Sequence, residues 1–302
     1  MVAEPVSQMA VIDVRGLSKD YGDTLANDDL TFAVEEGEIF GYLGPNGAGK
    51  TTTIRQLLGF ISPTGGTAEV LGADITDAEA LRRARRNVGY LPGELSFTES
   101  VTGRSFLEYQ ASLKGGDRLE EMTEIFDPPL DRKIRAYSSG NRQMLGLIQT
   151  FMHDPDLVIM DEPTSGLDPL KQEQLNTFLR EEREAGTTIF FSSHVLGEVR
   201  RACDRVGIIR EGQLVALEDI DSLLGKGGKR VRLHTEDSLS AGDLDLDGVV
   251  EFEQVGTVTR FTFTGDYNEL LTTLSEYSLV DMEIEEPPLE EIFLHYYGED
   301  HV

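Results

Sequence analysis

The hydrophobic and polar positions along the chain predict strands that alternate with helices. Short apolar runs, rich in β-branched or aromatic residues and bounded by Gly or Asp turns, predict strands at 11–14, 30–34, 38–43, 87–91, 157–160, 187–191 and 205–209. From residue 50 to 60 the apolar spacing becomes helical. Because strands and helices alternate, we expect a largely parallel sheet.

Two parts of the chain depart from this alternation. Between residues 97 and 153 the strand signal disappears, and helical spacing at 105–113 and 141–152 predicts an all-helical subdomain. Residues 225–228, Gly-Lys-Gly-Gly, have the composition of a linker. The tail predicts a small α+β unit, with strands at 229–234, 249–254, 257–264 and 279–285 and helices at 267–276 and 289–297. We expect a main domain over 9–224 and an accessory α+β domain over 229–302.

A phosphate-binding pattern lies where the first predicted helix begins. Residues 44–51 are Gly-Pro-Asn-Gly-Ala-Gly-Lys-Thr, directly after a predicted strand. The glycines let backbone N–H groups converge on an anion, Lys50 adds positive charge against the β- and γ-phosphates, and the Thr51 hydroxyl can ligate Mg²⁺. The alternative interpretation is a glycine-rich turn between strand and helix.

Two carboxylates end the apolar strand that begins at residue 157. Asp161 and Glu162 would lie at the carboxyl edge of a parallel sheet, beside the phosphate loop. There Asp161 can hold Mg²⁺ through water, and Glu162 can polarise the water that attacks the γ-phosphate. By itself, an acidic pair after a strand is more typical of a solvated turn.

Further motifs resemble, in order and spacing, those of ATP-binding cassette (ABC) subunits. Residues 161–164 (Asp-Glu-Pro-Thr), 165–168 (Ser-Gly-Leu-Asp) and 192–194 (Ser-Ser-His) resemble the Walker B, D-loop and H-loop elements. Residues 137–143 (Tyr-Ser-Ser-Gly-Asn-Arg-Gln) resemble the signature sequence. The resemblance covers about residues 9–224 and implies an α/β P-loop NTPase core with a helical subdomain, ATP and Mg²⁺ as cofactors, and ATP hydrolysis.

The resemblance also implies roles for individual residues. Lys50, Glu162 and His194 would be catalytic, and Thr51 and Asp161 would hold Mg²⁺. The nucleotide would be bound by Tyr21, which stacks on adenine, and by Gly44, Pro45, Asn46, Gly47, Ala48, Gly49, Lys50, Thr51, Thr52, Ser138, Ser139, Gly140 and Asn141.

A head-to-tail dimer follows from the same resemblance. Residues 44–51 of one subunit would face Ser138 and Gly140 of a second copy across ATP. A serine hydroxyl and a glycine N–H at a helix N-terminus suit the γ-phosphate from the opposite side, and His194 would contact the same phosphate. Each subunit alone then carries half of a site.

Three features depart from the common family pattern or extend it. Ser139 and Asn141 stand where many members have Gly and Gln, which resembles variants in the drug-export and ABC-2 branches. Gly93 stands where the family loop has a Gln that reaches the metal and senses the membrane partner, so Glu94 substitutes, a water does, or coupling is weaker. Residues 288–298 resemble the terminal helix of exporter-type cassettes, and a capping helix on its own sheet is the alternative.

Composition narrows the class of function. The formal net charge of −28 and the lack of clustered Lys and Arg argue against a nucleic-acid partner. The only cysteine, Cys203, rules out an internal disulfide. The sequence shows neither a spanning run nor a signal peptide, so we expect a place on the cytoplasmic face of the cell membrane.

The leading hypothesis is therefore the ATPase subunit of a transporter, an exporter by its branch, that works with separate membrane-spanning permease subunits. Two other classes compete with it. A soluble ABC ATPase acting on ribosomes or nucleic acid is disfavoured by the acidity and by the single cassette. A nucleotide-binding regulator without turnover is disfavoured because Lys50, Asp161, Glu162 and His194 are all present.

Strong acidity combined with scarce lysine, 7 Lys against 20 Arg, resembles proteins from salt-loving archaea. A dense carboxylate surface keeps a protein hydrated and dispersed when salt screens its self-repulsion. An acidic, solvated face without special ecology is the alternative.

The salt-rich hypothesis predicts that the purified protein loses structure or activity when salt is removed, because unscreened carboxylates repel one another. Circular dichroism and ATPase assays across a KCl series would measure this. A fully folded and active protein in low-salt buffer would support the alternative.

Overall fold

The computed structural model describes residues 10–220, 222–223, 228–236, 239, 244 and 246–285. Its contacts divide the chain into two compact units, Met1–Leu217 and Glu218–Val302. Most of the expected linker at 225–228, and all of the helix expected at 289–297, lie outside the described residues.

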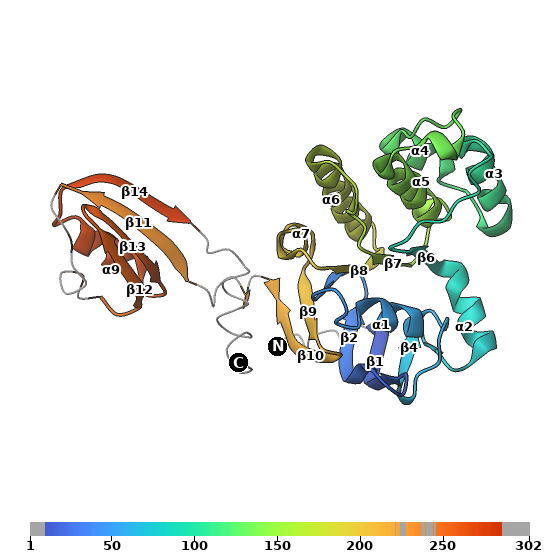
Figure 1. Ribbon diagram of the computed structural model, residues 1–302, viewed down its shortest axis with the longest axis horizontal. Helices are drawn as coiled ribbons and strands as arrows, with labels where there is room; N and C mark the ends of the chain where they lie inside the picture. The colour runs from blue at the N-terminus through green and yellow to red at the C-terminus, as the bar shows by residue number, and fades with distance from the viewer. Residues whose placement is uncertain are drawn as a thin grey trace, which may run out of the picture. The chain divides into compact units, whose positions relative to one another are not determined.

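A six-stranded sheet forms the centre of the first unit (Figure 1). Its strands run in the order β10 (Gln213–Asp219), β9 (Arg205–Arg210), β3 (Ile39–Leu43), β8 (Thr188–Ser193), β7 (Leu157–Asp161) and β6 (Val88–Leu91). The pairs from β9 to β6 are all parallel, which confirms the predicted parallel sheet. Every residue of β3, β7 and β8 is buried, as expected for parallel strands covered on both faces.

A second, antiparallel sheet holds the N-terminal strands. It runs in the order β2 (Leu25–Glu35), β1 (Ala10–Asp20), β4 (Gly65–Val70) and β5 (Ala73–Asp74). The sequence pattern predicts strands at 11–14 and 30–34 within a largely parallel sheet, so their place in a separate antiparallel sheet is a difference from the prediction. The connection from β1 to β2 spans only residues 21–24, and so short a connection can join only antiparallel strands.

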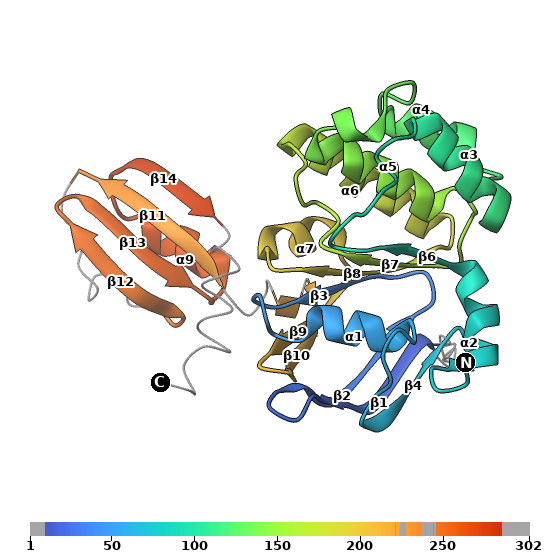
Figure 2. The ribbon, with the colours of Figure 1, turned by 45° about the vertical axis from the view of Figure 1, so that its right-hand side comes forward.

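Aromatic side chains pack the two sheets together. The ring centroid of Phe32, on β2, lies 5.7 Å from that of Phe40 and 5.5 Å from that of Tyr42, both on β3. Helix α1 (Lys50–Leu57) lies beside these sheets (Figure 2). Its Ile54 and Leu57 side chains belong to the same core as these rings. The start of α1 is thereby held beside the carboxyl end of β3.

Helices fill the segment between β6 and β7. They are α3 (Gly103–Lys114), α4 (Leu119–Phe126), the 3₁₀ turn η2 (Ile134–Ala136) and α5 (Ser139–Phe151), and no strand occurs over residues 97–153, all of which are described. Arg118 joins these helices to α6 (Pro169–Glu184) by donating to both oxygens of the buried Glu182, at 2.6 and 2.7 Å.

Three short helical elements complete the first unit. Helix α2 (Ala78–Ala84) and the 3₁₀ turn η1 (Arg85–Asn87) precede β6, and α7 (Leu196–Ala202) follows β8. Asp77 begins α2 by accepting hydrogen bonds from the backbone N–H groups of Glu79 and Ala80.

The described part of the second unit is built on a four-stranded antiparallel sheet, against which α9 (Tyr267–Leu274) packs. The strand order is β12 (Val249–Val255), β13 (Val258–Phe263), β11 (Lys229–Thr235) and β14 (Leu279–Glu285), and α9 contributes to its core. These elements correspond to the predicted strands and to the first predicted helix of the tail. In the described part of both units, no helix is long and apolar enough to cross a membrane.

Candidate active site

The loop at 44–51 joins β3 to α1 and depends on glycine. Gly49 has φ 109°, and a Cβ there would lie 2.4 Å from the carbonyl oxygen of Ala26. A Cβ at Gly44 would lie 2.3 Å from the carbonyl oxygen of Ile209. Both distances are too short for any side chain, so the backbone itself forms the loop surface.

Of the remaining loop positions, Pro45, Asn46 and Gly47 are exposed, Ala48 is buried, and Thr52 is half-buried in the first turn of α1.

Lys50 lies inside this loop. Its Nζ donates to the carbonyl oxygens of Gly44 and Pro45, at 2.6 and 3.0 Å. The same nitrogen is 3.9 Å from Oε1 of Glu162. Burial lowers the pKa of Lys50, while the carboxylates of Glu162 and Asp161 act in the opposite direction. The amine therefore lies between the phosphate loop and the carboxylates at the end of β7.

Asp161 connects three segments. The Thr51 hydroxyl donates to its Oδ2 at 2.7 Å, and the Ser192 hydroxyl donates to its Oδ1. Hydroxyl and carboxylate oxygens are the ligands that Mg²⁺ prefers, together with substrate phosphates. Among the described residues, no group of three or more His, Cys, Asp or Glu side chains could hold a metal by itself. The pair Thr51 and Asp161 therefore fits a Mg²⁺ ion that is also bound by a nucleotide.

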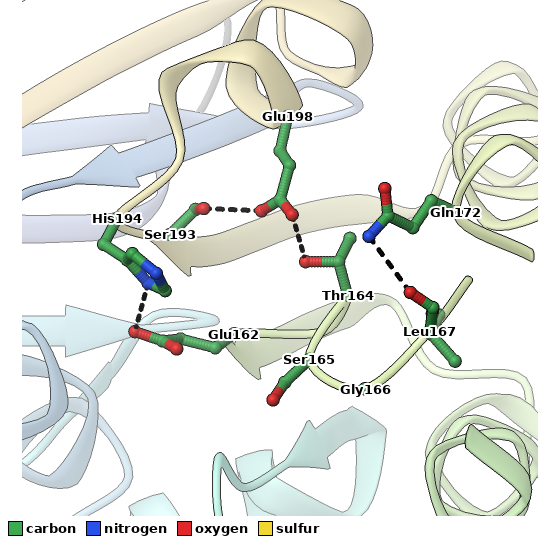
Figure 3. Close-up of a pocket in the computed structure, with 9 residues that line it drawn as sticks. All are labelled: Glu162, Thr164, Ser165, Gly166, Leu167, Gln172, Ser193, His194 and Glu198. Carbon is green, nitrogen blue, oxygen red and sulfur yellow. Dashed lines mark hydrogen bonds and ion pairs between the residues drawn. The ribbon is translucent and has the colours of Figure 1, made fainter. Parts of the chain in front are cut away.

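Glu162 has an unusual backbone. Its φ of 52° is in the left-handed region, which non-glycine residues adopt at a cost of about 1–3 kcal/mol. The conformation is held by its N–H, which donates to the carbonyl oxygen of Ser192 at 3.1 Å. Its Oε1 lies 3.0 Å from Nδ1 of His194 (Figure 3). Lys50, Thr51, Asp161, Glu162 and His194 thus come together in one chain.

The signature residues contact a different segment. Ser138 begins α5 by accepting a hydrogen bond from the N–H of Asn141, and both Ser138 and Ser139 are exposed. A Cβ at Gly140 would lie 3.2 Å from the carbonyl oxygen of Gly166. Farther along α5, Gln143 donates to the carbonyl oxygen of Pro163 at 2.7 Å.

Tyr21 is also exposed, with 56% of its surface accessible. Nζ of Lys19 lies 5.1 Å from the centroid of its ring.

Gly93 lies against Asp161. A Cβ at Gly93 would be 3.4 Å from Oδ2 of Asp161, so a longer side chain at this position would reach the carboxylate. A cavity of about 400 Å³ opens beside it and is lined by residues that include Thr51, Glu94 and Glu162. Glu94 therefore lines the same cavity as Thr51 and Asp161.

Sequence reasoning assigned no individual role to four polar residues beside the site, Thr164, Ser192, Ser193 and Glu198. Ser192 donates to Asp161, and the buried Glu198 accepts hydrogen bonds from Thr164 and Ser193 (Figure 3). For Glu198 the sequence offered one signal: an acidic residue lies between the apolar positions Leu196 and Val199 of a short helix, which indicates a buried carboxylate.

A parallel sheet with a phosphate loop after β3, two carboxylates at the end of β7 and a histidine after β8, the strand between them, defines a P-loop nucleotide-binding protein. A family profile for ABC transporters matches residues 27–165. An uncharacterized ABC transporter ATP-binding protein of Synechocystis sp. is 34% identical over 88% of this chain and 76% of its own. The bacitracin transport ATP-binding protein of Bacillus licheniformis is 33% identical over 90% of this chain and 95% of its own. The chain therefore belongs to the ATP-binding subunits of ABC transporters.

Solved structures show the same fold. A dimeric bacterial ABC transporter cassette superimposes with a TM-score of 0.64 at 20% identity and covers 69% of this chain and 98% of its own.

The loop geometry predicts that Gly49→Ala weakens binding of Mg-ATP by at least about ten-fold, because the new Cβ forces the loop away from Ala26. Isothermal titration calorimetry would measure the affinity. Gly37→Ala is the matched control, since Gly37 also has a positive φ of 73° but no atom within 4 Å of the added Cβ. Equal ATP affinity in the two variants would contradict the prediction.

Proposed function

We propose that this protein hydrolyses ATP to drive export through separate membrane-spanning subunits, and that it acts at the cytoplasmic face of the membrane. The observation that carries the proposal is the meeting of Lys50, Asp161, Glu162 and His194 at one edge of the sheet. The similarity to a bacitracin transport protein over nearly the whole chain supports export.

The geometry of the site supports the proposed roles. Glu162 is the general base that polarises the attacking water, and its strained backbone aims the carboxylate past the end of β7. His194, at 3.0 Å from Glu162, orients that carboxylate and contacts the γ-phosphate. Lys50 neutralises phosphate charge. When bound to Thr51 and Asp161, Mg²⁺ would supply further charge neutralisation at the phosphates.

We further propose that two copies complete the site. Ser138 and Ser139 are exposed, and the described contacts of Gly140 and Gln143 run to Gly166 and Pro163. The loop at 44–51 instead contacts Asp161 and Glu162. A second subunit, turned head to tail, would bring its signature residues to the open side of the nucleotide, as the dimeric assembly of the similar cassette suggests.

The competing class, an ABC ATPase acting on ribosomes or nucleic acid, is not supported. The net charge of −28 opposes phosphate-rich partners, and the similar proteins are transporter subunits.

Glu162→Gln should keep ATP binding but lower kcat by about 10²–10⁴-fold, because the amide cannot accept the proton of the attacking water. The trapped ATP should hold a dimer that light scattering detects after size exclusion. Glu184→Gln, in the exposed last turn of α6, is the control. Substantial hydrolysis by the Glu162 variant would refute its role as the base, and a monomer with ATP bound would refute the dimer.

Glu94→Ala should weaken the affinity for the divalent ion about ten-fold in the presence of ATP, because a carboxylate beside Thr51 and Asp161 is lost. Electron paramagnetic resonance with Mn²⁺ measures this without turnover. Glu108→Ala, exposed on α3, is the control. Unchanged Mn²⁺ affinity would instead favour a water or weaker coupling at Gly93.

A further inference from the structure

A buried carboxylate lies behind the candidate catalytic residues and has no assigned role. Glu198, in the first turn of α7, is only 8% exposed. Its Oε1 accepts a hydrogen bond from the Thr164 hydroxyl at 2.5 Å, and its Oε2 accepts one from the Ser193 hydroxyl at 2.6 Å (Figure 3). A buried carboxylate is stable only when its oxygens are satisfied in this way, so the three side chains hold one another in place.

The two donors belong to the segments that carry the catalytic side chains. Thr164 lies two residues after Glu162, and Ser193 directly precedes His194. The Ser193 hydroxyl also accepts from the N–H of Val195 at 2.9 Å, so its position is set from both sides. Since His194 contacts Glu162 at 3.0 Å, the contacts close a ring from Glu162 through Thr164, Glu198, Ser193 and His194.

The part of this ring between Glu162 and Thr164 also contacts α5, the helix that begins at the signature residues. Between Glu162 and Thr164, the carbonyl oxygen of Pro163 accepts from Gln143 of α5. The backbone then turns, with Ser165 N–H donating to the Glu162 carbonyl and Leu167 N–H donating to the Thr164 carbonyl. Thr164 in the segment 163–167 is therefore connected to Ser193 and His194 through its hydrogen bond to Glu198. A displacement of this segment would move Glu198, and with it Ser193 and His194.

From this geometry we infer that Glu198 is a positioning residue for ATP hydrolysis. It holds His194 in its position beside Glu162 and the segment 163–167. The inference rests on the proposed function, in which Glu162 and His194 act on ATP. A purely structural role, in which Glu198 only anchors α7 to the sheet, is the alternative. The two differ because anchoring affects stability, whereas positioning affects turnover at unchanged nucleotide affinity.

The test is Glu198→Gln, which keeps the shape of the side chain. Its carbonyl oxygen accepts one hydroxyl proton, but its amide nitrogen can only donate, so one of the two hydrogen bonds must break or reverse. We expect kcat to fall on the order of ten-fold while KM for ATP and the melting temperature change little. Glu184→Gln is the matched control for loss of one carboxylate charge.

Thr164→Val provides a second, isosteric variant that removes only one hydroxyl of the ring. Because Thr164→Val breaks the hydrogen bond between Thr164 and Glu198, and Glu198 acts on Glu162 and His194 through the same ring, the double variant should lower kcat by less than the product of the two single effects. Two independent effects that multiply would overturn the inference.

Three other results also decide the matter. A Glu198→Gln variant with wild-type kcat would overturn this inference and leave the proposed function intact. If kcat, the affinity for ATP and the melting temperature all fall together in Glu198→Gln, Glu198 only anchors α7 to the sheet. A wild-type protein that hydrolyses no ATP would overturn both the inference and the proposed function.

Discussion

The parallel pairing of β3, β7 and β8 is the constraint on which the rest of the site depends. In this register Leu43 lies opposite Ser193, and Asp161 lies opposite Ser192, so three chain segments leave the sheet at one edge. The phosphate loop follows β3, the carboxylates end β7, and His194 follows β8. The hydrogen bonds from Thr51 and Ser192 to Asp161 then connect these segments.

The segment after β7 links this edge to the rest of the unit. It begins with the strained Glu162, continues through Pro163 and Thr164, and reaches Gly166 beside the signature residues. Its partners come from α5 and α7. Because tightly packed contacts transmit small displacements rather than absorb them, this segment is where a second subunit bound at the signature residues would influence Glu162 and His194.

Prediction from the sequence succeeded for the strongly patterned elements and failed where the pattern was weak. The continuous apolar runs of β3, β7 and β8 identify strands buried on both faces. Strands β1 and β2 of the second sheet were predicted, but β4, Gly65–Val70, was missed because it contains two glycines and a glutamate and shows little strand signal. The family and its transport function, inferred from the ordered motifs, are confirmed by the similar proteins.

The sequence by itself determined the chemistry of the phosphate loop, because that loop is local: its glycines, Lys50 and Thr51 are adjacent in the chain, and the flanking strand and helix orient them. Only the tertiary structure decided what lies against it. The approach of Gly93 to Asp161, the contact of Gly140 with Gly166, and the burial of Glu198 between Thr164 and Ser193 join segments far apart in the chain. Such contacts depend on sheet order and packing, which no single stretch of sequence specifies.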